Sequence, residues 1–468
     1  MPATRRASPT PSARGRLPGS SNLRGDEMNR SWLIATGLTL LIAAATGACE
    51  PALDATSCPG DAGIPADAAW PPASMVHAAG TVIVDGDGAP LSLRCVNVDA
   101  WLLPIPYLVS DASKALLTSP SEFAARLDAV VGAPRAAEFW RQWRDAFITE
   151  ADFARIHALG FNCARLVVYH RAIATVTGDQ ATLDEARVAH VDAAVAWAKA
   201  QRLYLVLDLH TAPGGQNALP TVADVPSSDP VARLWEGPTA AANQRATVAL
   251  WRALAERYKD ETVIAGFDLL NEPSLPDGVA PSALVDLYRR LIAAVREVDP
   301  RHLVFVEGDA LAHDFSMFDA PLDANLAYEF HAYALTGLEA WATPELADLQ
   351  PYLDLRAAHD RPLWLGEFGE QTLEWQTQMT ALMDQHDIGW ALYPWKRKQT
   401  LFWNPVPQRI PDMPKWYAVA AYLARSPGGS TQPPSAADAE AGMAEALSVI
   451  GVERCAEDLA LVRSVLCH

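Results

Sequence analysis

The chain has 468 residues, half of them hydrophobic, and a formal net charge of −19. This length allows one large domain or two ordinary ones, and the apolar content supports a sizeable core and excludes general disorder. Because residues 1–48 carry a net charge of +4, the remainder carries −23, which argues against nucleic acid or an anionic membrane surface as a partner.

The N-terminal region predicts export. Residues 32–48 form an apolar run after Met28-Asn29-Arg30, and a basic start, an apolar stretch and small residues at the end are typical of a secretory signal peptide. The run is short for a membrane-spanning helix. We therefore expect residues 1–48 to be a signal peptide, in which residues 1–27 form an upstream extension if translation begins at Met28.

The residues around the expected cleavage site suggest a lipid anchor. Thr46-Gly47-Ala48-Cys49 resembles a bacterial lipoprotein cleavage box, in which Cys49 is lipidated. The sequence thus predicts a cell-surface or periplasm-facing lipoprotein attached to the membrane through Cys49, or a secreted protein.

Composition divides the rest of the chain into four parts. Residues 49–75 are rich in Ala, Pro, Asp and Ser and predict a flexible tether. One folded domain is expected over 76–425. A Pro/Gly/Ser-rich linker, 426–436, and an Ala-rich helical tail, 437–468, follow it.

The folded domain opens with a predicted β-hairpin, in which Thr81–Val84 pairs with Leu91–Arg94 through a Gly-rich turn. Strand-like and helix-like stretches alternate after it. The expected strands are 92–97, 163–168, 203–209, 264–270, 303–307, 326–331, 362–366 and 389–394. The expected helices are 150–159, 185–201, 240–259, 281–297, 344–359 and 371–385.

Eight strands separated mostly by helices predict an α/β fold of the (β/α)8 TIM-barrel type. A doubly wound open sheet is the structural alternative, but no Gly-rich phosphate loop follows the first strand, which disfavours a nucleotide-binding version. The segment 102–149 is long for a loop between a strand and a helix. We expect it to contain helices and to build one wall over the top of the barrel.

Two glutamates stand out because each ends a short apolar run. Glu272 follows Phe267-Asp268-Leu269-Leu270-Asn271, and Glu367 follows Leu363-Trp364-Leu365-Gly366, 95 residues later. Such runs predict buried parallel strands that deliver the two acids to one edge of the sheet. Glycoside hydrolysis needs two carboxylates that flank the bond, so the pair predicts a sugar-cleaving enzyme.

Other polar and aromatic residues end the predicted strands. In chain order with the two glutamates, the set is Arg165, His210, Asn271, Glu272, His331, Tyr333, Glu367 and Trp395. This order resembles the eight functional positions of glycoside hydrolase family 5, the cellulase-like retaining barrel glycosidases. The resemblance runs from about Gly86 to Leu423, and Asn271-Glu272-Pro273 together with Gly366-Glu367-Phe368 makes it specific.

The resemblance implies a role for each carboxylate. Glu367 is implied to be the nucleophile that forms a covalent glycosyl-enzyme, and Glu272 the acid/base that protonates the departing oxygen and then activates water. Arg165 is implied to lower the pKa of Glu367, and Tyr333 to hydrogen-bond it.

Further roles are implied for the remaining positions. Asn271 is implied to bind the sugar 2-hydroxyl, His210 and His331 to orient the sugar and the acid, and Trp395 to stack under the sugar ring at the cleaved bond. No cofactor and no metal are implied. The expected partner is an oligo- or polysaccharide, and we expect a monomer.

Within the family, three segments are most similar to the exo-β-1,3-glucanase side: 97–102, 147–153 and 208–217. That group continues the Arg165 strand as Ile-Pro-Val-Gly-Tyr-Trp, whereas this chain has Leu-Val-Val-Tyr-His-Arg over 166–171. The change removes the Pro and Gly that shape one pocket wall. We therefore expect a β-glucan substrate, with β-1,4 linkages slightly favoured over β-1,3.

Other residues receive structural or undecided interpretations. Glu370 is expected to start the next helix, where a carboxylate suits the N-terminal dipole. The chain has 15 Trp, and Trp101, Trp235 and Trp403 are each either sugar platforms or packing residues.

The six cysteines suit an exported protein. Their spacing favours disulfides between Cys455 and Cys467 and between Cys58 and Cys95, with Cys163 as a buried free thiol. No Cys/His spacing suggests a metal site.

Three alternative functions remain: a non-catalytic cell-surface carbohydrate-binding barrel, a hydrolase of mannan or a glycolipid head group, and a metal-dependent hydrolase that uses His210, His331 and a glutamate. The presence of both carboxylates argues against the first. Neither histidine belongs to a His-x-His or His-Glu-x-x-His cluster, which argues against the third.

Overall fold

The computed structural model describes residues 64, 68–102, 104–110, 117–334, 341–398, 405–425 and 432–467. The expected signal peptide, Cys49, most of the expected tether and Trp403 lie outside these residues. Over the described residues, no helix is both long and apolar enough to cross a membrane.

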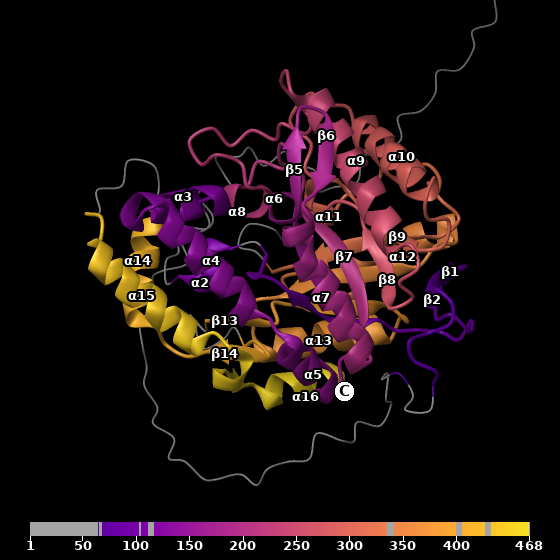
Figure 1. The fold of residues 1–468 in the computed structure, drawn as a ribbon. Helices are drawn as coiled ribbons and strands as arrows, with labels where there is room; N and C mark the ends of the chain where they lie inside the picture. Colours follow the sequence, from indigo (N-terminus) through magenta and orange to yellow (C-terminus); the bar gives the residue numbers. More distant parts are fainter. Residues whose placement is uncertain are drawn as a thin grey trace, which may run out of the picture.

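Eight parallel strands close into a barrel at the centre of the molecule (Figure 1). They are β3 (Arg94–Val98), β4 (Cys163–Tyr169), β7 (Tyr204–Thr211), β8 (Ile264–Asp268), β9 (Leu303–Glu307), β10 (Leu326–Ala332), β11 (Leu363–Gly369) and β12 (Gly389–Tyr393). β12 pairs with β3 and closes the ring. The eight predicted strands are confirmed, and closure rules out the doubly wound open sheet.

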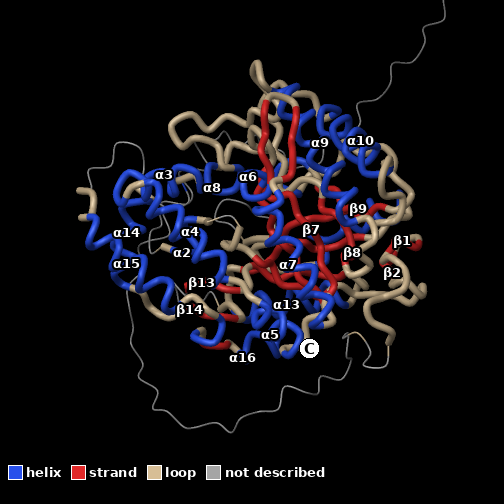
Figure 2. The backbone as a smooth tube through the Cα atoms, in the orientation of Figure 1, coloured by secondary structure: helices blue, strands red, loops and turns tan. Residues whose placement is uncertain are grey.

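Helices surround the barrel, and Figure 2 shows the strands enclosed by them. The six predicted helices are confirmed as α5 (Glu150–Ala158), α7 (Glu185–Gln201), α9 (Ala240–Tyr258), α10 (Ser282–Arg296), α12 (Leu346–His359) and α13 (Leu373–Asp384). Their starts are encoded locally: Thr149 and Asp152 form a capping box before α5, and Asp184 accepts from two backbone N–H groups of α7. Because helices cover their outer faces, residues of the barrel strands are buried along almost their whole length.

The N-terminal hairpin exists, but its predicted pairing is wrong. β1 (His77–Ala79) pairs antiparallel with β2 (Val82–Val84). Of the predicted pairing, the Leu91 N–H donates to the Ile83 carbonyl at 2.9 Å, and Val84 bridges to Pro90 just before the predicted segment. The reason is that Arg94 and the residues after it belong to the barrel, where β3 pairs with β4 and β12.

The long segment before α5 is helical, as predicted. It forms α2 (Pro106–Val109), α3 (Pro120–Val131) and α4 (Ala133–Phe147), and α3 and α4 pack with α14 (Pro414–Leu423) and α15 (Ala436–Val449). In Figure 1 these four helices form a lobe beside the barrel. Its core is an aromatic cluster of Phe123, Phe139, Trp140, Trp143 and Trp416. Much of the high Trp content therefore serves packing.

Short elements complete the fold. The hairpin of β5 (Ala174–Thr177) and β6 (Gln180–Leu183) follows β4 and α6 and projects from the barrel (Figure 1). The others are α6 (His170–Ile173), α8 (Pro220–Ala223), α11 (Asp309–Ala312), β13 (Lys396–Lys398), β14 (Gln408–Ile410), η2 (Val452–Arg454), β15 (Ala456–Glu457) and α16 (Leu459–Leu466).

The C-terminal tail is part of the folded body. α15 packs on α14, β15 pairs with β14, and α16 packs on α13. Met443, Ile450, Leu461 and Val465 are buried in these contacts. The tail is helical as predicted, and its apolar residues extend the core around the barrel.

The disulfides differ from those predicted. Cys95 and Cys163 are bonded between the neighbouring strands β3 and β4, where they face each other in register. Cys163 is therefore not a free thiol, and Cys95 does not pair with Cys58. The predicted Cys455–Cys467 bridge is also wrong, because Cys455 is a free thiol and Cys467 belongs to a different disulfide. Spacing along the chain does not show which strands become neighbours.

Candidate active site

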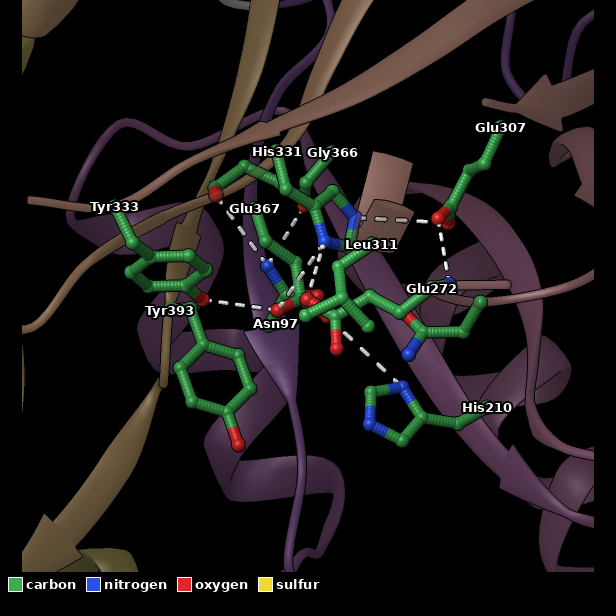
Figure 3. A network of polar contacts seen from close by, with 12 residues as sticks. Asn97, His210, Glu272, Glu307, Leu311, His331, Tyr333, Gly366, Glu367 and Tyr393 are labelled. Carbon is green, nitrogen blue, oxygen red and sulfur yellow. Dashed lines mark hydrogen bonds and ion pairs between the residues drawn. The ribbon is translucent and has the colours of Figure 1, made fainter. Parts of the chain in front are cut away.

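Most of the predicted site residues meet at the C-terminal end of the barrel. The strands carry Arg165 (β4), His210 (β7), His331 (β10) and Glu367 (β11), while Asn271 and Glu272 follow β8 and Tyr333 follows β10. Figure 3 shows that the side chains of His210, Glu272, His331, Tyr333 and Glu367 point toward one another.

The two glutamates lie close enough to act on one bond. A carboxylate oxygen of Glu272, a carboxylate oxygen of Glu367 and a ring nitrogen of His331 all lie within 4.8 Å of one another. Glu272 follows β8 and Glu367 lies in β11, with β9 and β10 between these strands, so this spacing depends on the curvature of the barrel wall.

Both carboxylate oxygens of Glu367 accept hydrogen bonds. Arg165 Nη1 donates to Oε1 at 2.6 Å, and the Tyr333 hydroxyl donates to Oε2 at 2.9 Å. Burial raises the pKa of Tyr333 well above its usual range, so its hydroxyl keeps the proton that it donates. A charged donor and a neutral donor thus fix this carboxylate in place.

The side chain of Glu272 has a different environment. His331 Nδ1 lies 3.0 Å from Oε1 of Glu272. Burial raises the pKa of Glu272, and the opposing effects of His210, His313 and Arg165 are smaller. A carboxyl group with a raised pKa keeps its proton more readily near neutral pH, as a general acid must.

The backbone of Glu272 is held in an unusual conformation. Its φ is 47°, in the left-handed region that residues other than glycine rarely adopt. Two side chains hold it there: the N–H donates to Glu307 Oε2 at 2.6 Å, and the C=O accepts from Asn217 Nδ2 at 2.9 Å. Strain of this kind persists where surrounding contacts impose it, and such sites cluster at functional positions.

Arg165 is fully buried at the centre of an acidic cluster. Five carboxylates have an oxygen within 3.4 Å of its guanidinium: Asp208, Asp268, Glu307, Glu329 and Glu367. One cation does not balance five buried anions. Accordingly, burial raises the pKa of Asp208 to about 8 and those of Glu307 and Glu329 well above their usual range. Several of these groups are therefore held as neutral acids.

Four members of this cluster were not predicted from the sequence, and we call them the buried acids: Asp208, Asp268, Glu307 and Glu329. A signal for Glu307 was present, because it ends the apolar run Leu303–Val306 in the same way that Glu367 ends its own. Asp208 and Glu329 lie inside their strands, and Asp268, the last residue of β8, is followed by Leu269 and Leu270. None of these three therefore ends an apolar run.

Asn271 and His210 are fixed by members of the same cluster. Asn271 Oδ1 accepts from Arg165 Nη2 at 2.9 Å, and its Nδ2 is buried without a partner among the described residues. His210 Nδ1 lies 2.8 Å from Asp208 Oδ2 and 3.9 Å from Glu367 Oε1. The free Nδ2 of Asn271 is a donor available to a ligand.

Trp395 is not brought to the site. Its side chain is 0% exposed, and its Nε1 donates to Asp152 Oδ1 at 3.0 Å. The aromatic residue of β12 beside the site is instead Tyr393, whose ring contacts that of Tyr333 edge-on and whose hydroxyl donates to Asp99 Oδ2. Tyr393 was not predicted because Trp395, two residues later along the chain, has the aromatic residue type expected at this position.

The undecided residues also have defined places. Glu370 does not start a helix, because α13 begins at Leu373 after its cap Thr372; Glu370 instead forms an ion pair with Arg397. Trp101 is 2% exposed and Trp235 is 7% exposed, and the indole N–H of each donates to a backbone carbonyl. Both are packing residues.

Two groups of described residues have donor atoms near enough to share a cation: Glu272 with His331 and Glu367, and Glu307 with Glu329 and His331. The guanidinium of Arg165 already contacts Glu307, Glu329 and Glu367, and thus supplies positive charge to both groups. The metal-dependent alternative required His210 beside His331, but His210 bonds Asp208 and belongs to neither group.

The family model for cellulase, glycosyl hydrolase family 5, matches residues 127–399. A beta-xylosidase of Phanerodontia chrysosporium is 32% identical over 308 residues, which cover 63% of this chain and 62% of the relative. A probable glucan 1,3-beta-glucosidase A of Neosartorya fischeri is 31% identical over 224 residues, covering 47% and 50%. This chain thus spans less than two thirds of either relative.

Among solved structures, the catalytic domain of an endoglucanase from Thermobifida fusca superimposes with a TM-score of 0.46 and 16% identity, covering 80% of this chain and 97% of that one.

Proposed function

This chain belongs to glycosyl hydrolase family 5, and we propose that it is a retaining β-glycosidase that cleaves a β-glucan or a related β-linked glycan. One observation carries the proposal: oxygens of Glu272 and Glu367 lie within 4.8 Å of each other. Retaining glycosidases hold their carboxyl groups roughly 5–5.5 Å apart, whereas inverting enzymes leave roughly 6.5–9.5 Å for a water molecule.

In the first step, Glu367 attacks the anomeric carbon and the glycosidic C–O bond breaks. The departing oxygen takes the proton of Glu272, whose raised pKa suits it to this task. Arg165 and Tyr333 hold the attacking carboxylate in line. The product is a covalent glycosyl ester of Glu367.

In the second step, Glu272 acts as a base. It takes a proton from water, the water oxygen attacks the anomeric carbon, and the ester bond to Glu367 breaks. The sugar leaves with its original anomeric configuration. The unpartnered Nδ2 of Asn271 is suited to donate to the sugar 2-hydroxyl, a contact that strengthens as charge develops on the ring.

The substrate is proposed at the level of β-linked glucans and their close relatives. The sequence slightly favours β-1,4 linkages. Because the relatives are named as a beta-xylosidase and a glucan 1,3-beta-glucosidase, a β-xyloside and β-1,3-glucan are further substrates to test.

The test is sugar release by residues 76–468 from β-1,4-glucan, β-1,3-glucan, a β-xyloside, β-mannan and a glycosphingolipid, with Glu367→Gln as the blank. Release that is absent in the blank, with product of retained configuration by proton NMR, is the expected result. Inverted product would overturn the retaining mechanism. If the folded protein released sugar from none of these substrates, a carbohydrate-binding role would be favoured.

We also propose that the protein is exported as a monomer and anchored through lipidated Cys49. We propose residues 76–425, on which Trp70 and the C-terminal tail also pack, as the catalytic domain, and the part of 49–75 that precedes Trp70 as its tether. The support is the sequence pattern around Thr46–Cys49. Cys49→Ser should move the protein from the membrane fraction to the soluble one. Unchanged fractionation would contradict the anchor.

A further inference from the structure

Glu307 is a fully buried acid that the two proposed steps do not use. Its two oxygens face two different parts of the site (Figure 3). Oε2 accepts the backbone N–H of Glu272 at 2.6 Å, and Oε1 lies 3.6 Å from Nε2 of His331. Glu307 therefore contacts the proposed acid/base residue directly. It also lies near Nε2 of His331, whereas Glu272 lies near Nδ1 of the same ring.

The position of one proton on His331 decides how it contacts Glu272. Burial lowers the pKa of His331 to about 3, so the ring is neutral and carries a single N–H. With this proton on Nδ1, the ring donates to Oε1 of Glu272, 3.0 Å away, whether that carboxyl group is ionised or protonated. Oε2 of Glu272 then remains as the oxygen that gives and receives the catalytic proton.

The alternative tautomer has a different consequence. With the proton on Nε2, Nδ1 of His331 accepts a hydrogen bond only while Glu272 is protonated, and it repels the carboxylate formed after the first step. The tautomer with the proton on Nδ1 therefore suits both steps, and it needs a donor on the other side of the ring, at Nε2. Nε2 is buried and has no hydrogen-bond partner among the described residues.

Glu307 is placed to supply that donor. Its Oε2 is occupied by the Glu272 N–H, so a proton on Glu307 belongs on Oε1, which faces Nε2. The groups that face Glu307 from the surrounding elements are Arg165, Asp208, Asp268, Tyr288, Glu329 and His331. Burial and the neighbouring acids raise the pKa of Glu307, which keeps it protonated.

Glu329 is a weaker candidate for the same task. Its Oε1 lies 3.8 Å from Nε2 of His331 but only 3.0 Å from Nε of Arg165. Gly366 makes room for this arrangement, because a Cβ there would come within 1.7 Å of Glu329 Oε1. Oε1 of Glu307 also contacts Arg165, but at 3.4 Å from Nη2, and it lies closer to the imidazole than Glu329 does. Glu329 is therefore held more tightly by the guanidinium, and Glu307 is the nearer acid to Nε2 of His331.

We propose that Glu307 is a positioning residue that, as a neutral acid, holds the proton of His331 on Nδ1 and so selects Oε2 of Glu272 as the oxygen that exchanges the catalytic proton. The proposal rests on the acid/base role proposed for Glu272.

Two substitutions of similar length test it. In Glu307→Gln the side-chain amide keeps an N–H donor for His331 and a carbonyl acceptor for the Glu272 N–H, so we expect kcat and its pH profile to stay close to wild type. Glu307→Met removes both groups. We expect kcat to fall by roughly 10- to 100-fold with KM little changed, because the acid is misplaced and substrate binding is not.

Three kinetic outcomes would overturn the proposal. A Gln variant as impaired as the Met variant would mean that a negative charge is needed at Glu307. A Met variant with wild-type kcat would mean that this side chain positions nothing. A loss confined to KM would place the effect in substrate binding.

A spectroscopic measurement tests the proposal without turnover. ¹⁵N-labelled histidine, with His331→Gln for assignment among the 11 histidines, should show a ring protonated on Nδ1 in the wild type and in Glu307→Gln. A ring protonated on Nε2 overturns the inference even if the enzyme is active. A ring protonated on Nδ1 in a protein that cleaves no glycan would support the positioning of the proton by Glu307 while the proposed function, and with it the catalytic role of Oε2, fails, so the two failures are distinguishable.

Discussion

Glu367 and Glu272 are the same side chain at one end of one barrel, but their surroundings differ. Glu367 accepts from a guanidinium at one oxygen and from a phenol at the other. The Glu272 side chain is contacted by an imidazole, and burial dominates the shift of its pKa. The contacts of Glu367 therefore supply positive charge and hydrogen-bond donors to a carboxylate, whereas burial of Glu272 favours a carboxyl group that keeps its proton.

The comparison shows that the two proposed roles come from tertiary contacts. Arg165, which contacts Glu367, lies three barrel strands from β11, and Glu307, which holds Glu272, comes from a different strand again. A carboxylate at a strand end becomes a candidate nucleophile or a candidate acid according to what the other strands bring to it.

The largest expected effect is the loss of kcat when Glu367 is replaced, and it distinguishes the roles of the two glutamates most clearly. Glu367→Ala should lower kcat on the order of 10⁵- to 10⁶-fold, because no covalent intermediate forms without the attacking carboxylate. Azide should restore turnover by attacking the anomeric carbon directly, giving a glycosyl azide of inverted configuration. The exposed Glu374→Ala in α13 is the matched surface control. Absence of rescue in folded protein would argue against Glu367 as the nucleophile.

Glu272→Ala should lower kcat less than Glu367→Ala does, and the size of the loss should depend on the leaving group. A natural glycan needs its departing oxygen protonated, so we expect a loss of roughly 10²- to 10⁴-fold. An aryl glycoside with an acidic phenol leaves without that proton, so its first step should be nearly unaffected and a burst of phenol should precede slow hydrolysis. Equal losses on both substrates would contradict the acid/base role.

Tyr333→Phe tests the contribution of one donor to Glu367. Loss of a hydrogen bond to a charged group costs about 1.5–3 kcal/mol, so we expect kcat/KM to fall by roughly 10- to 150-fold. Tyr328→Phe is a matched control in β10, the strand that Tyr333 follows, since its hydroxyl bonds His359 away from the carboxylates. The control should lower thermal stability alone. A control as inactive as Tyr333→Phe would show that the strand had been disturbed.

Much of this fold was predictable because its signals are local. Each barrel strand is a short apolar run, and helices such as α7 begin at a capping Asp. The catalytic end was predictable for the same reason, since Arg165, His210 and Glu367 lie in their strands in the order that a barrel requires.

The errors concern relations between distant segments. The Cys95–Cys163 bond depends on which strands become neighbours, and the buried acids depend on which side chains point inward around Arg165. Trp395 had the expected residue type, but Asp152, from the capping box of α5, binds its indole away from the site. Such contacts are set by closure of the barrel, which no local pattern contains.

The smallest expected effect extends the comparison of Glu272 and Glu367 to the buried acids around Arg165. Burial raises the pKa of Asp208 from 3.8 to about 8. Between these values the folded chain holds a proton that the unfolded chain has lost, so the free energy of unfolding falls as pH rises. His170 and His331, with pKa values lowered to about 3, act in the opposite direction only up to about pH 6.5, the ordinary histidine pKa.

The effect of the buried acids should therefore appear between about pH 6.5 and 8, where the melting temperature of the wild type should fall by a few degrees. Asp208→Asn has no proton to lose there, so its melting temperature should fall less steeply. The exposed Asp286→Asn, which also removes one carboxylate, should keep the wild-type slope. Equal slopes in all three proteins would show that Asp208 is ionised in the folded state throughout this range.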